Sequence, residues 1–164
     1  MKVKGKKYTF LVREAKLPDG RTTRVEMIEH PGAALIIPFI TSRKIIMLRQ
    51  YRAVLGRYLY ELPAGTLEKG EKPLSCAQRE LAEETGYGAK KLTQLGKIIP
   101  VPGYSDEVIH IFKAEGLARQ DAVKDVDEII QTFLMSRQEV LSHFRKGKIV
   151  DGKTICALAF CGWL

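Results

Sequence analysis

Residues 65–87 read GTLEKGEKPLSCAQRELAEETGY, and this stretch decides most of what the chain can be. It places three carboxylates, those of Glu80, Glu83 and Glu84, at relative positions i, i+3 and i+4. On an α-helix these spacings share one face, where like charges repel each other. Such a cluster needs a cation among its members, and carboxylate oxygens are the ligands that Mg²⁺ prefers. The stretch therefore predicts a helix with an acidic, metal-binding face.

The residues around the three glutamates predict where this helix begins and ends. Pro73 suits a first helical turn, and Gly86 follows the last turn as a stop signal. Leu74, Ala77 and Leu81 recur at i, i+3 and i+7, which gives the helix an apolar stripe that can pack on a sheet. We therefore expect a loop and a helix with one buried and one acidic face.

The spacing resembles the Nudix box, the signature of a family of hydrolases, in which Gly, Glu, Arg-Glu, Glu-Glu and Gly recur at fixed intervals. The fixed positions are filled without a gap by Gly65, Glu71, Arg79, Glu80, Glu83, Glu84 and Gly86, and the two bulky apolar positions by Leu81 and Tyr87. This pattern is far more specific than a single glycine-rich loop. The other interpretation is an ordinary exposed helix that happens to be acidic.

The resemblance implies an α/β fold, a Nudix-type α/β/α sandwich with a mixed β-sheet, preceded by an N-terminal β-hairpin. We expect one domain over residues 1–164, with the hairpin in residues 1–30 as a candidate for exchange between the subunits of a homodimer. Apolar and β-branched runs predict strands at 8–17, 22–29, 33–40, 44–51, 58–62, 92–99, 107–115 and 129–135. Two further helices are predicted over 137–145 and 151–164, and a long loop over 116–128.

The resemblance also assigns roles to the acids of the box. Glu80 and Glu84 are expected to bind Mg²⁺ directly, with Mn²⁺ as a substitute, and the backbone carbonyl of Ala64 is expected to complete the coordination. Glu83 is expected to serve a neighbouring ion or to polarise a water molecule, so that Glu83 and Glu84 count as catalytic. Metal ions in such a site neutralise phosphate charge and lower the pKa of bound water.

A single helix face rarely encloses a metal ion, so another carboxylate is expected from the predicted loop 116–128. The resemblance implies that a glutamate of this loop acts as base or metal ligand, and Glu128 is the candidate for the catalytic base, while Asp125 and Asp127 remain open as alternatives. The resemblance also implies that Glu71 and Arg79 pair and hold the box loop to the helix, as supports more than as ligands.

The sequences that flank the box resemble those of ADP-ribose pyrophosphatases. LRQYR at 48–52, YELPAG at 60–65 and PGYSDE at 102–107 carry this resemblance, and Pro102 lies 16 residues after Gly86. It implies hydrolysis of ADP-ribose to AMP and ribose 5-phosphate. The predicted substrate-binding residues are Arg49, Arg52, Glu61, Gly103 and Glu107. Two strand residues separated by three face opposite sides, so one of the two arginines is expected to reach the substrate while the other serves elsewhere.

Three other functions remain open at this point. The first is a Nudix hydrolase for another nucleoside diphosphate derivative, such as GDP-mannose, NADH or a dinucleoside polyphosphate. The second is a sensor of nucleotide sugars without catalysis, against which the complete set of box acids argues. The third is an RNA-processing enzyme, which the net charge of +8 favours but the scattered basic residues do not. The positive charge fits attraction of a small anionic substrate, so we expect no nucleic-acid partner.

The composition of the chain indicates the cellular compartment in which the protein is expected. The chain has three cysteines, Cys76, Cys156 and Cys161, without the spacing of a metal site. The N-terminal residues lack the apolar segment of a secretion signal, and no apolar run is long enough to cross a membrane. We therefore expect a cytoplasmic protein with reduced thiols and no membrane partner.

Overall fold

The structure, a computed structural model, describes residues 1–5, 8–122 and 129–164. Its centre is a seven-stranded sheet in the order β10-β5-β4-β9-β8, with β6 paired to β5 and β7 paired to β4. The bounds are β4 Ala33–Thr41, β5 Lys44–Arg52, β6 Arg57–Glu61, β7 Ala64–Thr66, β8 Tyr87–Ile98, β9 Ile109–Arg119 and β10 Ile130–Ser136. Strand β4 runs parallel to β9 and antiparallel to β5 and β7, so the sheet is mixed.

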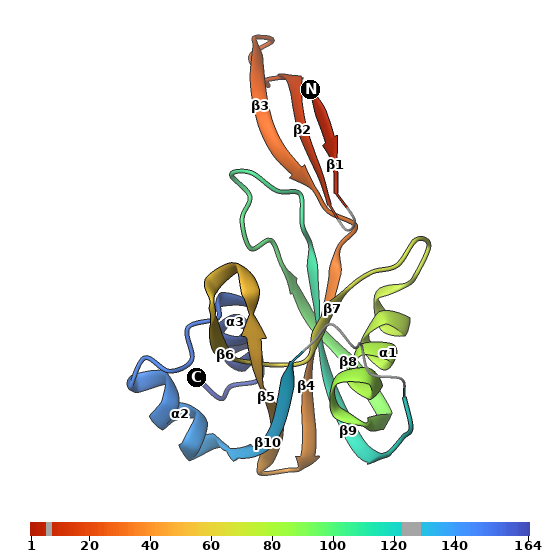
Figure 1. The fold of residues 1–164 in the computed structure, drawn as a ribbon, viewed down its shortest axis with the longest axis vertical. Coiled ribbons are helices and arrows are strands. Elements are labelled where there is room, and N and C mark those ends of the chain that lie inside the picture. The colour runs from red at the N-terminus through yellow and green to blue at the C-terminus, as the bar shows by residue number, and fades with distance from the viewer. Residues whose placement is uncertain (6–7, 123–128) are drawn as a thin grey trace.

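Helices cover both faces of this sheet, as Figure 1 shows. Helix α1 (Pro73–Thr85) lies on one side, and α2 (Arg137–Arg145) and α3 (Gly152–Phe160) lie on the other. A single 3₁₀ turn, Ala53–Leu55, joins β5 to β6. The predicted α/β sandwich with a mixed sheet is therefore confirmed.

The central strand β4 explains how the two helical layers are held. Its residues are apolar without alternation because both faces of the strand are buried. Ala34 and Ile36 pack with the α1 residues Cys76, Ala77 and Leu81. On the other face, a larger apolar cluster joins the sheet to α2 and α3, and its members include Leu35, Ile37, Val140, Ala157, Leu158 and Trp163. This packing thus fixes the position of α1, and with it the position of its acidic face, relative to the sheet.

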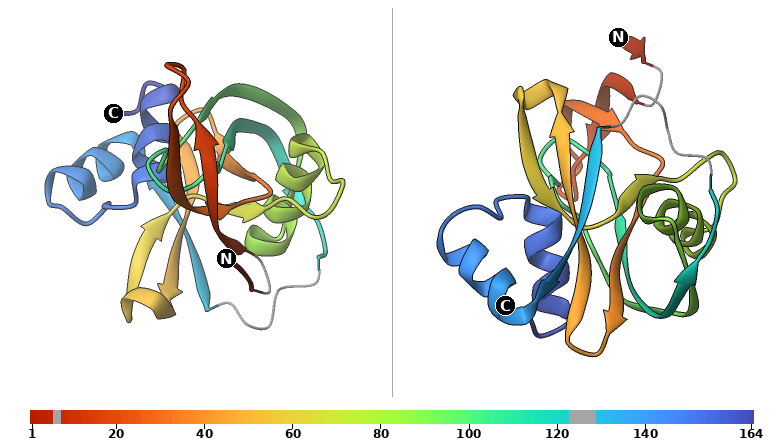
Figure 2. Two further views of the ribbon diagram at one scale, coloured as in Figure 1. Left: turned by 90° about the horizontal axis from the view of Figure 1, so that it is seen from above. Right: turned by 60° about the horizontal axis from the view of Figure 1, so that its bottom comes forward.

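The N-terminal residues form a separate antiparallel sheet of three strands, β1 (Lys2–Lys4), β2 (Thr9–Lys16) and β3 (Thr22–Glu29). It projects from one end of the molecule, as the views in Figures 1 and 2 show. The loop before β9 secures its base, since the Ser105 hydroxyl donates to the carbonyl of Ile28 at 3.1 Å. The Asp106 carboxylate accepts the backbone N–H of His30 at 2.8 Å. The predicted hairpin is present, and the short β1 adds a strand that the sequence did not predict.

Several predicted boundaries differ from the structure. Strand β8 begins at Tyr87 and not at residue 92, and β9 continues to Arg119, into the predicted loop 116–128. The two extensions pair with each other, with Tyr87 opposite Arg119, and this mutual pairing outweighs the polar and glycine-containing local sequence. The last helix ends at Phe160 and not at residue 164, because Gly162 has a φ of 72° and turns the chain. No helix in the described part of the chain is long and apolar enough to span a membrane.

Candidate active site

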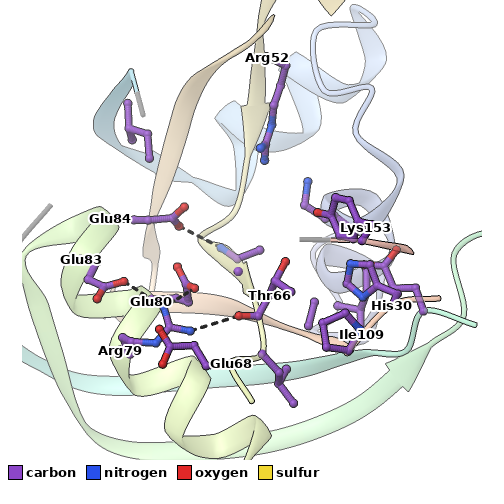
Figure 3. A pocket seen from close by; sticks show the side chains of 18 of the residues that line it. His30, Arg52, Thr66, Glu68, Arg79, Glu80, Glu83, Glu84, Ile109 and Lys153 are labelled. Carbon is purple, nitrogen blue, oxygen red and sulfur yellow. Dashed lines mark hydrogen bonds and ion pairs between the residues drawn. The ribbon is translucent and has the colours of Figure 1, made fainter. Parts of the chain in front are cut away.

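A cavity of about 840 Å³ opens in front of the acidic face of α1. It collects side chains that are far apart in the sequence, as Figure 3 shows. The residues predicted from the sequence that line it are Arg52, Ala64, Arg79, Glu80, Glu83, Glu84 and Glu107. Tyr8, His30, Thr66, Glu68, Lys69, Ile109 and Lys153 line it as well and had no predicted role.

Arg79 is the cation among the acids of α1. Its Nη1 donates to Glu80 at 2.6 Å and to Glu83 at 3.1 Å. Its Nε donates to Oε1 of Glu71 and its Nη2 donates to Oε2, both at 3.0 Å, and Nη2 also donates to the carbonyl of Thr66 at 3.2 Å. One guanidinium therefore offsets the repulsion between carboxylates that share a helix face.

The contact between Glu71 and Arg79 has electrostatic consequences for both groups. The hydrogen bonds from Arg79 hold the pKa of the Glu71 carboxyl below its ordinary value, and the same bonds raise the pKa of the guanidinium. Glu71 also accepts the backbone N–H of Glu68 at 2.9 Å. The expected pair is present, and it ties the loop after β7 to the middle of α1.

Glu84 and Glu80 are positioned by the backbone of β7. The Glu84 carboxylate accepts the N–H of Ala64 at 3.0 Å, and the Glu80 carboxylate lies where a β-carbon on residue 65 would be. The side chain of Cys76 approaches the same segment and donates to the carbonyl of Gly65 at 3.5 Å. Both glutamates are buried, since the whole residue is 9% exposed for Glu80 and 7% exposed for Glu84. The carboxylates therefore take their positions from the strand as much as from the helix.

The donor set matches a hard divalent cation in its chemistry. Glu80, Glu83 and Glu84 offer carboxylate oxygens at one cavity, which is the ligand type that Mg²⁺ prefers. Among residues 1–5, 8–122 and 129–164, however, no three Asp, Glu, His or Cys side chains converge closely enough to enclose an ion. Arg79 holds Glu80 and Glu83 by hydrogen bonds at this face. A bound cation would have to compete with Arg79 for these oxygens.

Arg52 and the buried Glu61 form an ion pair at another wall of the cavity. The Arg52 Nε and Nη2 donate to the two carboxylate oxygens of Glu61 at 2.7 and 2.6 Å. The Glu61 side chain is only 1% exposed, and it also accepts from Lys153 of α3. Arg52 faces the cavity, while Glu61 is not among its described lining residues.

Two other predicted substrate-binding residues lie away from the cavity. The Arg49 guanidinium stacks on the Tyr58 ring at 4.2 Å and donates to Gln131 at 3.2 Å. Gly103 lies in the exposed loop before β9, with open space where a β-carbon would be. The side chains of Arg49 and Arg52 thus lie in different environments, as the spacing of the two residues on one strand predicted. The predicted base Glu128 and its alternatives Asp125 and Asp127 lie outside the described residues, so their role stays a prediction.

His30 and its neighbours form a part of the cavity that the sequence did not reveal. The ring of Tyr8 stacks on His30 with centroids 4.9 Å apart. The His30 Nδ1 accepts the backbone N–H of Gly32 at 3.0 Å, so the ring proton of a neutral His30 lies on Nε2. That nitrogen is 3.5 Å from a carboxylate oxygen of Glu107. These contacts join the base of the N-terminal sheet to the cavity wall, and no local sequence motif predicts them.

Comparison with known proteins places the site in a family. The family described as NUDIX domain matches residues 29–158, which include α1 and all of the described lining residues except Tyr8. The chain belongs to the Nudix family. It is 38% identical to an ADP-ribose pyrophosphatase of Bacillus subtilis (strain 168) over 158 residues, which are 95% of this chain and 85% of the relative.

Two further similarities agree with this assignment to the Nudix enzymes. A methanol dehydrogenase activator of Bacillus methanolicus is 37% identical over 158 residues, with 95% of this chain and 85% of the relative covered. A crystal structure of an ADP compounds hydrolase superposes with a TM-score of 0.82 at 22% identity, and covers 97% of this chain and 86% of the other. That structural likeness shows the shared fold. Nudix hydrolases in general use divalent metal ions, which agrees with the donor set of α1.

Proposed function

We propose that this Nudix enzyme hydrolyses the diphosphate bond of ADP-ribose with Mg²⁺, and that the products are AMP and ribose 5-phosphate. One observation carries the proposal: a single cavity has the box carboxylates on one side and the cations Arg52 and Lys153 on other sides. A diphosphate needs a metal ion at the reacting phosphorus and positive charge around its remaining oxygens. The relative named ADP-ribose pyrophosphatase supports the choice of substrate.

The box residues would hold the metal ion. Glu80 and Glu84 would be its carboxylate ligands, and the carbonyl of Ala64 would complete the set. A bound Mg²⁺ neutralises phosphate charge and lowers the pKa of a coordinated water molecule. Glu83 would orient water near the ion, and Arg79 would yield its bonds to Glu80 and Glu83 while its bonds to Glu71 keep the loop in place. Glu128 remains the proposed base.

The opposite walls would hold the substrate. Arg52 can donate charge-assisted hydrogen bonds to phosphate or ribose oxygens, and Glu107 can accept from ribose hydroxyls. The cavity volume of about 840 Å³ falls within the range of small-molecule sites. Glu61, predicted as a substrate ligand, would act here by fixing Arg52.

The proposal includes the oligomeric state and the cellular location of the protein. We propose that residues 1–164 form one domain and that two copies form a homodimer, with the N-terminal sheet exchanged towards the partner's cavity. The projection of this sheet and the exposed Val3 and Phe10 support that arrangement. Arg49 and Gly103 would then serve the subunit interface. Light scattering should give the mass of a dimer, and a monomer at assay concentration would contradict it. We further propose a cytoplasmic location and no nucleic-acid partner.

A substrate panel tests the proposed reaction. Purified protein with Mg²⁺ is given ADP-ribose, NADH, GDP-mannose and a dinucleoside polyphosphate, and the products are identified by chromatography. We expect the highest kcat/KM for ADP-ribose, with AMP and ribose 5-phosphate in equal amounts and no turnover in EDTA. A clear preference for GDP-mannose would overturn the choice of substrate, while absence of all hydrolysis with Mg²⁺ or Mn²⁺ would favour a sensor.

A further inference from the structure

The first turn of α3 meets the segment that leads into the Nudix box. Thr154, which is fully buried, accepts the backbone N–H of Leu62 at 3.0 Å. Asp151 caps the helix by accepting the N–H of Thr154 at 3.1 Å. Lys153 lies between these two residues and donates to both Glu61 and Asp151. The two ion pairs therefore orient the ammonium group of Lys153, and the bond between Leu62 and Thr154 attaches α3 to the segment before the box.

Lys153 shares the carboxylate of Glu61 with Arg52. Burial by itself raises the pKa of the Glu61 carboxyl, but the hydrogen bond from Arg52 and the charge of Lys153 outweigh it, and the pKa lies below its ordinary value. Glu61 is therefore an anion that binds two cations. Its carboxylate and that of Asp151 are not among the described lining residues, whereas Arg52 and Lys153 both line the cavity. The side of this cluster that faces the cavity is thus positive.

The ammonium group of Lys153 retains a donor for a ligand. An ammonium carries three N–H groups. Two of them serve Glu61 and Asp151, and these are the partners of Lys153 among the described residues. The side chain is 20% exposed and lines the cavity, so a ligand in the cavity can contact it. In Figure 3 it lies on the opposite side of the view from Glu80, Glu83 and Glu84.

We propose that Lys153 is a substrate-binding residue, which α3 presents to the diphosphate group of the substrate. ADP-ribose carries its negative charge on that group alone, so a cation on the wall that faces the metal-binding acids gains most by contacting it. Glu61 and Asp151 are then positioning residues that hold the ammonium group of Lys153 in place. The inference rests on the proposed hydrolysis of a nucleoside diphosphate derivative and adds α3 to the substrate site.

Substitution of Lys153 tests this inference through KM and kcat for ADP-ribose. Lys153→Met removes the charge and keeps the length of the side chain, and we expect it to raise KM roughly tenfold, the effect of one hydrogen bond to a charged group. Lys148→Met removes the same charge from an exposed position in the same part of the chain and should leave KM unchanged. Lys153→Arg should restore most of the binding.

A structural role of Lys153 predicts a different result. Thr154→Val breaks the attachment of α3 to Leu62 without removing any charge. We expect it to lower Tm while KM stays close to that of the wild type. If Lys153→Met lowers Tm as Thr154→Val does and leaves KM unchanged, Lys153 acts only through packing and the inference is overturned. Should Lys153→Met fail to fold, Lys153→Gln keeps a donor towards Glu61 and serves as the neutral variant.

Binding of ADP separates this inference from the proposed function. ADP contains the diphosphate, and its Kd can be measured by calorimetry in EDTA without turnover. We expect Lys153→Met to weaken ADP binding roughly tenfold and Lys148→Met to leave it unchanged. If ADP-ribose is not hydrolysed but ADP binds in this way, the proposed reaction fails and the role of Lys153 holds. Equal ADP affinity of wild type and Lys153→Met, or no ADP binding to the wild type, overturns the role of Lys153.

Discussion

The carboxylate of Glu80 occupies the space that a β-carbon on residue 65 would fill, so Gly65 is what allows Glu80 to lie against β7. Gly65 does not have a positive φ, and its requirement is therefore close approach and not an unusual backbone conformation. The same carboxylate contacts Arg79 at 2.6 Å. The first glycine of the box thus sets the position of a proposed metal ligand.

Gly65→Ala should remove activity with little loss of stability. The added methyl group must displace the Glu80 carboxylate, and misplacement of a reacting group by about 1 Å costs roughly 100-fold in rate. We expect kcat with ADP-ribose to fall by about that factor while Tm changes little. Gly152→Ala, where nothing lies within 4 Å of the new β-carbon, is the matched control and should retain activity. Full activity of Gly65→Ala would show that Glu80 does not need its present position.

Arg79→Lys should lower the stability of the fold as well as the activity. A lysine ammonium cannot reproduce the planar set of bonds from Arg79 to Glu71, Glu80, Glu83 and the carbonyl of Thr66. We expect the free energy of unfolding in urea to fall by about 1.5–3 kcal/mol, the range for hydrogen bonds to charged groups. Arg145→Lys on the exposed end of α2 is the control. Equal stability of Arg79→Lys and wild type would refute the supporting role of Arg79.

Glu61 should make stability depend on acid pH. Its folded pKa lies below the ordinary value of 4.5, so its contribution is present above that value and is lost as the pH falls below it, through the folded pKa. Glu61→Gln should therefore be less stable than wild type at pH 7, and the difference should shrink at acid pH. Urea unfolding at both pH values measures this. A difference that stays constant with pH would mean that Glu61 titrates alike in both states.

The sequence pattern of the box was sufficient to predict helix α1 and its acidic face. Its spacing fixes which carboxylates share a face of α1, and Pro73 and Gly86 mark the ends of the helix at Pro73 and Thr85. Strand β4 was equally predictable, because a strand that is buried on both faces appears in the sequence as a continuous apolar run. In these segments local sequence and tertiary environment favour the same structure.

Features that depend on distant contacts were not predictable in this way. Lys153 meets Glu61 across 92 residues, and His30 meets Asp106 across 76 residues. A lysine in the first turn of a helix resembles any solvated lysine until the strand beside it is known. One signal was available: a glutamate at the end of an apolar strand, as Glu61 is, needs a cation, and Arg52 and Lys153 both meet that need.

Turnover of ADP-ribose by Glu84→Gln tests the central claim, that the carboxylates of α1 carry the chemistry. A glutamine oxygen can still accept the N–H of Ala64, as Glu84 does at 3.0 Å, so the fold should remain and Tm should confirm it. Removal of the ligand charge should lower kcat by roughly 100-fold or more, since a catalytic metal supplies several kcal/mol of transition-state stabilisation. Wild-type protein should form AMP and ribose 5-phosphate with Mg²⁺ while folded Glu84→Gln forms almost none. Near-wild-type turnover by folded Glu84→Gln would contradict the account.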